Sequence, residues 1–435
     1  MTNPQYTYDL DDRPPLRYAV LYGLQWAVIM FPTLIIAAAL CSKALHMEVG
    51  EEVRFLQLTL LASGLFTAAQ SLWGHRYPVL EGPSSAVLLT FIVLAPNGLQ
   101  VIQGGTLFGG GLLIVLVATG QLKRLVSLAT PNVVGVILML IAFSLLPYLA
   151  ASMAGVDSAH SNGSLWILSS SLVLIVVIAA LSHWLPGIWK TVAILLGMFV
   201  GTVFFFAMDF PDWRAVSTAR WISAPGSFVP SSPRFHWPVL AAYAASYLAV
   251  VVNSLGSLHG IAGVTDRERL PCAVSRGIFI NGAAGICCGL TGLVGMVSYS
   301  ISPGVVLANR VASRYATACG GIILMVAALV PKLAALLAMV PAPVVGAALC
   351  VAMGAQTGSA LDTVSSAGMK RRDYFVVGLP VLVGTLVGFL PAGLLQEAPF
   401  AFRVFMGNGL IIGIVLVLLL EHIVLRVRKP SKSEA

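Results

Sequence analysis

The chain has 435 residues, of which 58% are hydrophobic and 10% are charged, and its formal net charge is +8. Uncharged apolar stretches of about twenty residues recur along the sequence, which excludes a water-soluble globular protein and predicts a polytopic helical protein of the cell membrane, with the lipid bilayer as its surroundings. The basic residues lie in short connections between the apolar runs, so membrane topology accounts for the positive charge and nucleic acid is not expected as a partner.

The first twelve residues are polar and acidic, unlike a cleaved signal peptide, so the first apolar run is expected to remain as a membrane span. The apolar runs predict fourteen segments in total. Those of the first half are 18–41, 54–73, 79–95, 104–120, 130–151, 165–182 and 190–208; those of the second half are 238–262, 273–293, 300–308, 316–338, 341–356, 374–391 and 402–424. The third segment opens on Gly82 and Pro83 and the tenth is short, so both are predicted to be discontinuous.

The basic residues predict the orientation of these segments. Eighteen of the 25 Lys and Arg residues fall on one side of the predicted spans and seven on the other. Because short cytoplasmic connections are rich in Lys and Arg, both termini are predicted to be cytoplasmic, as a tail over 1–17 and a basic tail over 426–435.

An internal repeat relates the fourth and fifth segments to the eleventh and twelfth. At one fixed offset, the pair Gly109 and Gly110 aligns with Gly320 and Gly321, and the run VVG at 133–135 aligns with the VVG at 344–346. An odd number of spans separates the copies, so the sequence predicts two inverted seven-segment repeats over 18–208 and 238–425, as in secondary transporters. The third and tenth segments occupy matching places, where such a fold binds its substrate.

The connection over 209–237, predicted to be extracytoplasmic, is aromatic. It contains Trp213, Trp221, Phe228 and Trp237, which favour anchoring at the membrane interface over ligand binding. The six cysteines lie in or beside apolar runs without a C-x-x-C pattern, so helix packing is expected rather than disulfides, a metal site or redox chemistry.

The candidate substrate residues begin with Glu81, a carboxylate in an otherwise apolar segment. It could carry a coupling proton, accept hydrogen bonds from substrate N–H groups, or tie down the unwound backbone. The broken helices also offer main-chain groups, positive half-helix N-termini and hydroxyls to a small planar or anionic solute. These hydroxyls belong to Ser84, Ser85, Ser300 and Ser302. The alternative interpretation is that Gly and Pro only kink packed helices.

Polar residues inside the first and eighth segments are further candidates. The amide of Asn253, in the same span as Ser257, could recognise the edge of a heterocycle or could bond a neighbouring helix, and Gln25 in the first segment allows the same two interpretations. His75, His183 and His259 are interpreted as residues of the membrane edge without metal-ligand spacing. The sequence lacks a phosphate loop or nucleophile motif, so neither ATP hydrolysis nor enzymatic turnover is expected.

These motifs resemble the nucleobase–cation symporters of the xanthine/uracil permease and nucleobase/ascorbate transporter group, and among them the divergent purine-permease-like bacterial members. The resemblance extends over 12–425. It rests on DRPP at 12–15, GLQ at 23–25, YPVLEG at 77–82, NG at 281–282 and VPAPVVG at 340–346. It implies seven plus seven inverted segments, a core domain of segments 1–4 and 8–11, and a gate domain of 5–7 and 12–14. It further implies short antiparallel strands in segments three and ten, a homodimer, and uptake driven by protons or sodium without another cofactor.

The sequence departs from this family at the substrate site. Ile301 stands where uracil and xanthine permeases keep an acid or amide that holds the base, and Asn253 stands where they keep a glutamate. Glu81 is therefore the clearest mid-membrane carboxylate for proton coupling. The expected function is proton-coupled uptake of a nucleobase, foremost a purine or related heterocycle of the xanthine, uric acid and uracil class. An anion transporter of the sulfate/bicarbonate type is the alternative, because its third segment has a similar Gly-Pro-Ser-Ser-Ala run, and a transport-inactive substrate sensor is the second alternative.

Overall fold

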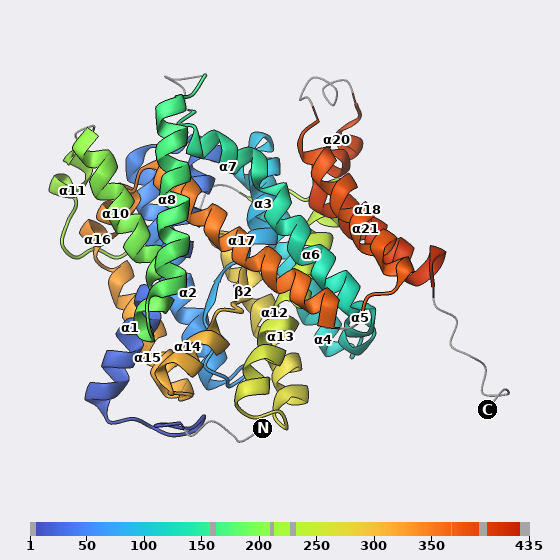
Figure 1. The fold of residues 1–435 in the computed structure, drawn as a ribbon, viewed down its shortest axis with the longest axis horizontal. Coiled ribbons are helices and arrows are strands. Elements are labelled where there is room, and N and C mark those ends of the chain that lie inside the picture. Colours follow the sequence, from blue (N-terminus) through green and yellow to red (C-terminus); the bar gives the residue numbers. More distant parts are fainter. Residues whose placement is uncertain are drawn as a thin grey trace.

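The computed structural model describes residues 6–156, 162–208, 213–226, 232–366, 368–390 and 398–426, so Phe228 and the basic residues from 427 onward lie outside the described residues. The chain is mostly helical (Figure 1). Its first half contains α1 (Leu16–Leu45), α2 (Val49–Leu72), β1 (Glu81–Pro83), α3 (Ser85–Leu94), η1 (Ala95–Asn97), α4 (Leu99–Ala118), α5 (Leu122–Leu128), α6 (Pro131–Ser144), α7 (Leu146–Met153), α8 (Leu165–Trp184), α9 (Ile188–Thr191), α10 (Ala193–Met208) and α11 (Arg214–Thr218). Its second half contains α12 (Trp237–Val264), α13 (Leu270–Thr291), β2 (Met296–Ser298), α14 (Ser302–Asn309), α15 (Arg314–Ala328), α16 (Pro331–Ala338), α17 (Ala342–Ser366), α18 (Arg371–Gly388), α20 (Phe400–Met406), α21 (Gly409–Leu419) and the π-helical turn η2 (Leu420–Val424).

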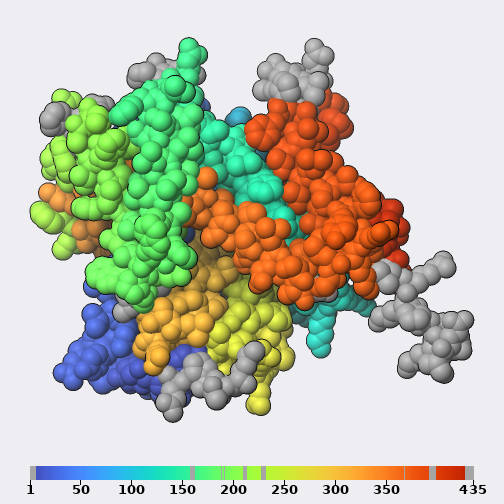
Figure 2. All heavy atoms as spheres, in the orientation of Figure 1, coloured from blue at the N-terminus to red at the C-terminus, as the bar shows by residue number. Residues whose placement is uncertain are grey.

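Among the described residues, eight helices are long and apolar enough to cross a membrane, or ten if each bent helix pair forms one span. Some of them expose apolar side chains that a water-soluble protein would bury: on α8, Leu172, Val173 and Val176 are each more than half exposed. Figure 2 shows α8, α17 and α18 on the viewed face, with α13 and α14 below them. The expected polytopic helical protein is confirmed at this level.

Several helices differ from the expected segments. The twelfth segment was expected to end at 356, but α17 continues to Ser366 through residues that include the helix formers Ala360 and Leu361. The eleventh is bent by 91° between α15 and α16, where Val330 precedes Pro331, and the residue before a proline is disfavoured in helical geometry. The fourteenth is bent by 76° between α20 and α21.

The two strands form a short antiparallel ribbon. Glu81 pairs with Ser298, Gly82 with Val297 and Pro83 with Met296, and all six residues are buried. Each strand is followed by a short helix, α3 after β1 and α14 after β2. Segments more than 200 residues apart in the sequence are thereby joined inside the protein (Figure 1).

The repeated glycines are sites of close helix packing. Gly110 of α4 lies against Gly282 of α13: a Cβ added to Gly110 would be 2.6 Å from the Gly282 carbonyl oxygen. Gly321 of α15 lies against Gly64 of α2 in the same way, and a Cβ added to Gly321 would be 2.5 Å from the Gly64 carbonyl oxygen. The preceding glycine of each pair also packs closely on a helix of the other half: Gly109 on Tyr247 of α12, and Gly320 on α1. The fourth helix of each half therefore packs on the first two helices of the other half.

The helices form two groups by contact. In the first group, α2 packs on α15, α4 on α13, and α1 on α15; α3, α12, α14 and the strands belong with them. In the second group, α6 packs on α17, α18 and α21, while α8 packs on α10 and α17. Contacts between α1 and α17 and between α12 and α20 join the groups.

The N-terminal segment extends along the first group. Tyr8 forms a parallel bridge with Val311, directly after α14, and Asp11 forms ion pairs with Arg269 at 2.6 Å and Arg314 at 2.7 Å. The hydrogen bond from Arg269, together with Arg314, lowers the pKa of the Asp11 carboxyl group below its usual value. This segment thus connects the loop before α13 to the start of α15.

Candidate functional site

Glu81 is fully buried and is held by α2 and by the opposite strand. Its main-chain N–H donates to the Thr67 hydroxyl at 3.0 Å, and its carbonyl accepts from Ser63. Its carboxylate oxygen Oε1 accepts from the Ser298 hydroxyl and lies 3.6 Å from Nε2 of His75, which is also fully buried. Among the described residues, Oε2 has no hydrogen-bond partner. The carboxylate is therefore inside the protein and out of reach of a solute in this conformation.

His75 was expected at the membrane edge; it lies three residues after the end of α2, and its side chain is fully buried within the protein. Its Nδ1 lies 3.0 Å from the main-chain N–H of Tyr77 and must accept from it, so the neutral ring carries its proton on Nε2, which faces Glu81. The amide of Gln70 accepts from the main chain of His75 and donates to Asn281 of α13. A polar network that extends from α2 to α13 therefore positions the imidazole beside the carboxylate.

The first of the two arms around the ribbon consists of β1 and α3. Ser84 caps α3, because its hydroxyl accepts from the N–H of Val87 at 3.4 Å, and its own N–H donates to Gly295 at 2.8 Å. The N–H groups of Ser85 and Ala86 have no intrahelical acceptor, as in the first turn of any helix. Ser85 is partly exposed, while Ser84 is buried. The hydroxyl of Ser84 is thus structural, and that of Ser85 makes no hydrogen bond within the described residues.

The second arm consists of β2 and α14. The Ser302 hydroxyl donates to the Tyr299 carbonyl at 2.9 Å and accepts from the N–H of Leu80 at 3.1 Å. The hydroxyl of Tyr299 in turn donates to Pro83 at 2.8 Å. Ser302 and Tyr299 therefore fasten the second arm to the first.

The start of α14 is open beyond that attachment. Ser300 is exposed, Ile301 is 42% exposed, and a Cβ added to Gly304 would meet no atom within 4 Å. Pro303 lies against Gly260 of α12, which brings that helix beside this first turn. The main chain from 300 to 304 therefore borders open space next to α12.

Asn253 and Gly256 of α12 belong to the same region. The Asn253 side chain is partly exposed and forms no hydrogen bond with any described residue, and Gly256 also faces open space. The Ser257 hydroxyl, in contrast, lies 2.7 Å from the Ser298 carbonyl oxygen and holds α12 to β2. Asn253 thus has an amide available for a ligand, and Ser257 has a structural bond.

Gln25 of α1 forms a reciprocal amide pair with Asn309 at the end of α14. The Gln25 nitrogen donates to the Asn309 oxygen at 3.0 Å, and the Asn309 nitrogen donates to the Gln25 oxygen at 2.8 Å. Trp26 is buried beside it. The pair fixes the far end of the second arm, and Asn309 is a partner that the sequence did not reveal.

The expected site residues thus divide into two sets. The side chains of Gln25, Glu81, Ser84, Ser257 and Ser302 make bonds that hold the two arms, whereas those of Ser85, Asn253, Ser300 and Ile301 make no side-chain hydrogen bond with the described residues. His75, Thr67 and Tyr299 were missed. The only sequence signal for His75 was its position six residues before Glu81.

The sequence matches known proteins over most of its length. The xanthine/uracil permease profile, described as a permease family, matches residues 17–393. The uric acid permease PucK of Bacillus subtilis is 27% identical over 422 residues, covering 95% of this chain and 97% of that protein. The xanthine permease of Bacillus subtilis is 23% identical over 419 residues, covering 95% of each. The uracil permease of Escherichia coli is 24% identical over 432 residues, covering 96% of each.

Two solved structures share the fold. The transmembrane domain of the cyanobacterial bicarbonate transporter BicA matches with a TM-score of 0.53 at 15% identity, over 93% of this chain and 97% of that one. The murine anion transporter Slc26a9 in its inward-facing state matches with a TM-score of 0.64 at 12% identity, over 94% of this chain and 69% of that one. At these identities the likeness concerns the fold.

Proposed function

The chain belongs to the xanthine/uracil permease family of membrane permeases, and on that premise we propose that it is a secondary active transporter that takes up a nucleobase together with protons. The substrate is a purine or related heterocycle of the xanthine, uric acid and uracil class. It binds where α12 meets the start of α14. The observation that carries this proposal is the Asn253 amide, which has no hydrogen-bond partner among the described residues and lies on the same face of α12 as Gly260, two turns away, where the helix meets Pro303.

The chemistry of this region suits a planar heterocycle. An amide presents donors and an acceptor in one plane, as the edge of a nucleobase does. The N-terminal main chain of α3 and α14 supplies further donors and the positive ends of two helix dipoles. A Cβ added to Gly256 or to Gly304 would meet no atom within 4 Å, so a ring can come close to the backbone at either position.

We assign the coupling proton to Glu81 and His75. The two side chains are fully buried, 3.6 Å apart, and Glu81 also accepts from Ser298 of β2. If substrate binding shifts the β1–β2 ribbon, the hydrogen bond from Ser298 would change the surroundings of the Glu81 carboxylate, without contact between Glu81 and the substrate. Buried ionisable groups inside a membrane protein commonly mark such proton paths.

We base the proposed transport cycle on the two helix groups. We propose fourteen segments in two inverted repeats, with the first group as the core domain and the second as the gate, and with both termini in the cytoplasm. The exchanged glycine contacts support the repeat, because Gly109 and Gly110 pack on α12 and α13 as Gly320 and Gly321 pack on α1 and α2. Motion of the core against the gate would expose the site to each side in turn.

Uptake by cells that lack their own nucleobase permeases tests the proposal. Radiolabelled xanthine, urate and uracil should enter cells that express the protein, and Asn253→Ala should weaken uptake about 30-fold, since two hydrogen bonds of about 1 kcal/mol each are lost. Gln121→Ala, at an exposed amide outside the site, is the matched control and should behave as the parent. Uptake of sulfate or bicarbonate without any nucleobase would contradict the proposal and favour the anion alternative.

A further inference from the structure

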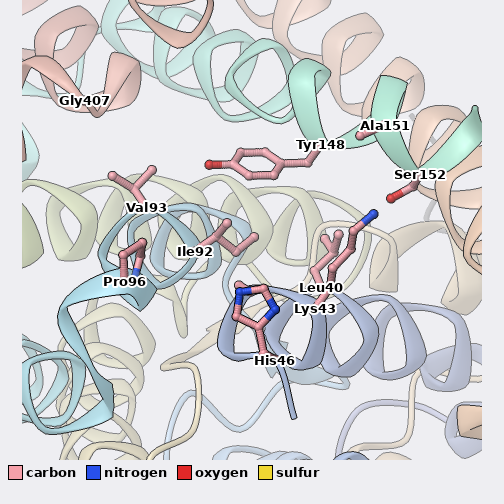
Figure 3. Close-up of a pocket in the computed structure, with 11 residues that line it drawn as sticks. Leu40, Lys43, His46, Ile92, Val93, Pro96, Tyr148, Ala151, Ser152 and Gly407 are labelled. Atoms are coloured by element: carbon pink, nitrogen blue, oxygen red, sulfur yellow. The ribbon is translucent and has the colours of Figure 1, made fainter. Parts of the chain in front are cut away.

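A cavity of about 420 Å³ lies between the two helix groups, away from the ribbon. The end of α1, the end of α3 and η1 line it from the first group, and α7 and the turn between α20 and α21 line it from the second (Figure 3). Ser85 begins α3 at the ribbon and Ile92 reaches the cavity, so the two places are about 10 Å apart along the helix. The cavity is therefore separate from the site at α12 and α14.

The position of the cavity places it before that site on an inward path. It lies at the end of α1 opposite to the N-terminal segment, so with cytoplasmic termini it is on the extracytoplasmic side. Because both helix groups contribute to its wall, it would change shape when the core moves against the gate. A solute that enters from outside would meet this cavity first.

The polar lining of the cavity is cationic. Among the described residues that line it, Lys43, His46 and Tyr148 are ionisable and none is a carboxylate. The Lys43 ammonium group donates to the Val156 carbonyl at 2.8 Å, which leaves further N–H donors for a ligand. In Figure 3 the Lys43 amine extends toward Ser152 at one side of the cavity.

Most of the remaining lining residues are apolar. Tyr148 is partly buried, forms no hydrogen bond with the described residues, and lies across the cavity in Figure 3, opposite the aliphatic side chains of Ile92 and Val93. An aromatic face with aliphatic groups opposite accommodates a planar ring, and the hydroxyl adds a polar handle. The volume of the cavity, its aromatic and aliphatic walls and its positive charge therefore all fit a planar anionic ligand.

We propose that this cavity is a capture site for a planar, singly anionic heterocycle, which Tyr148 stacks upon and Lys43 attracts before the solute passes to the Asn253 site. This rests on the proposed function and deepens it, because it makes the transporter favour anionic over neutral nucleobases at low external concentration. Urate, which is a monoanion at neutral pH, is the probe, and uracil is the neutral reference.

Kinetics of uptake give the first test. Tyr148→Ala should raise the KM for urate about 10-fold through loss of stacking. Lys43→Gln should raise it about 3-fold at low salt, since Lys43 is exposed and its field is screened, while Lys43→Arg keeps the charge and should restore the parent value. The KM for uracil should not change in Lys43→Gln. Lys332→Gln, at a lysine stacked on Trp221, is the control.

Binding at the cavity can be read without transport. Ala151→Cys places a thiol in the lining, and urate added outside the cells should slow its reaction with a membrane-impermeant maleimide, with the parent chain as the background. The protection should persist when Asn253→Ala is added, because the capture site does not include Asn253. Equal protection by sulfate, loss of protection with Asn253→Ala, or an unchanged urate KM in Lys43→Gln would each overturn the inference.

The outcomes separate the two proposals. If nucleobases are taken up but Lys43→Gln and Tyr148→Ala behave as the parent, the capture site is wrong and the transporter stands. If urate protects Ala151→Cys but no nucleobase is taken up, the cavity binds the anion and the proposed transport function is wrong.

Discussion

The two arms, β1 with α3 and β2 with α14, differ in how far they are buried and hydrogen-bonded within the protein. In the first arm, Glu81 and Ser84 are buried and bonded to neighbouring elements. In the second arm, Ser300, Ile301 and Gly304 border open space. The first arm is thus closed by its own contacts, and the second is open; under the proposed function the closed arm would hold the coupling proton and the open arm would contact the solute.

The largest expected effect tests the charge in the closed arm. Glu81→Gln removes the ionisable group without changing its size, so proton-driven accumulation should be lost. A gradient of one pH unit supports about tenfold accumulation for each coupled proton, and the variant should fall to equal concentrations inside and outside. Exchange of labelled for unlabelled substrate should persist. Glu268→Gln, at an exposed loop glutamate, is the control, and a variant that still accumulates substrate with the parent's pH dependence would exclude Glu81 as the proton carrier.

A matched pair of glycines tests the packing of the two arms. A Cβ at Gly82 would lie 2.8 Å from the ring of Tyr299, whose hydroxyl is bonded to Pro83, whereas a Cβ at Gly304 meets nothing within 4 Å. Gly82→Ala should therefore cost about 1–3 kcal/mol of stability, and Gly304→Ala, at an open position of α14, should unfold at the parent temperature or slightly above it. Thermal unfolding in detergent measures both. Equal stability of the two variants would mean that the arms are equally open.

The outline of this fold was accessible from the sequence because membrane spans depend on local composition. Apolar runs located the helices, and the pair at Gly109 and Gly110 with its copy at Gly320 and Gly321 located equivalent packing sites. Helix ends were less accessible. The continuation of α17 to Ser366 depends on tertiary surroundings, since residues 357–366 are too polar to register as a span.

The site was only partly predictable for a similar reason. An unusual residue type, such as Glu81 or Asn253 in an apolar run, can be recognised in the sequence, but its partners are distant along the chain. The contacts of Glu81 with Ser298 and of Gln25 with Asn309 join residues more than 200 positions apart. Only the folded chain shows which hydroxyls make hydrogen bonds within the protein. Those of Ser84 and Ser302 do, and that of Ser85 makes none with the described residues.

The smallest expected effect concerns the anchor of the open arm. Asp11→Asn removes the ion pairs to Arg269 and Arg314, the latter being the first residue of α15. The side chain of Asp11 is 56% exposed, so the loss should stay below about 1 kcal/mol at neutral pH and shrink in high salt.

The pH dependence of that effect has a definite sign. Because the pKa of Asp11 is lowered in the folded protein, its contribution is complete above the ordinary aspartate pKa of about 4 and is lost as the pH falls through the lowered value. The difference in unfolding temperature between parent and Asp11→Asn should therefore close in acid. Asp362→Asn, at an exposed position of α17, should show no difference at either pH, and a gap that persists in acid would argue against the ion pairs as its cause.

Equilibrium binding of radiolabelled urate or xanthine to the purified protein tests the division between the arms most directly. We expect Glu81→Gln to bind within about threefold of the parent, because the carboxylate is buried and bonded to Ser298, and Asn253→Ala to bind about 30-fold more weakly. Unchanged binding by Asn253→Ala, together with loss of binding in Glu81→Gln, would contradict the account.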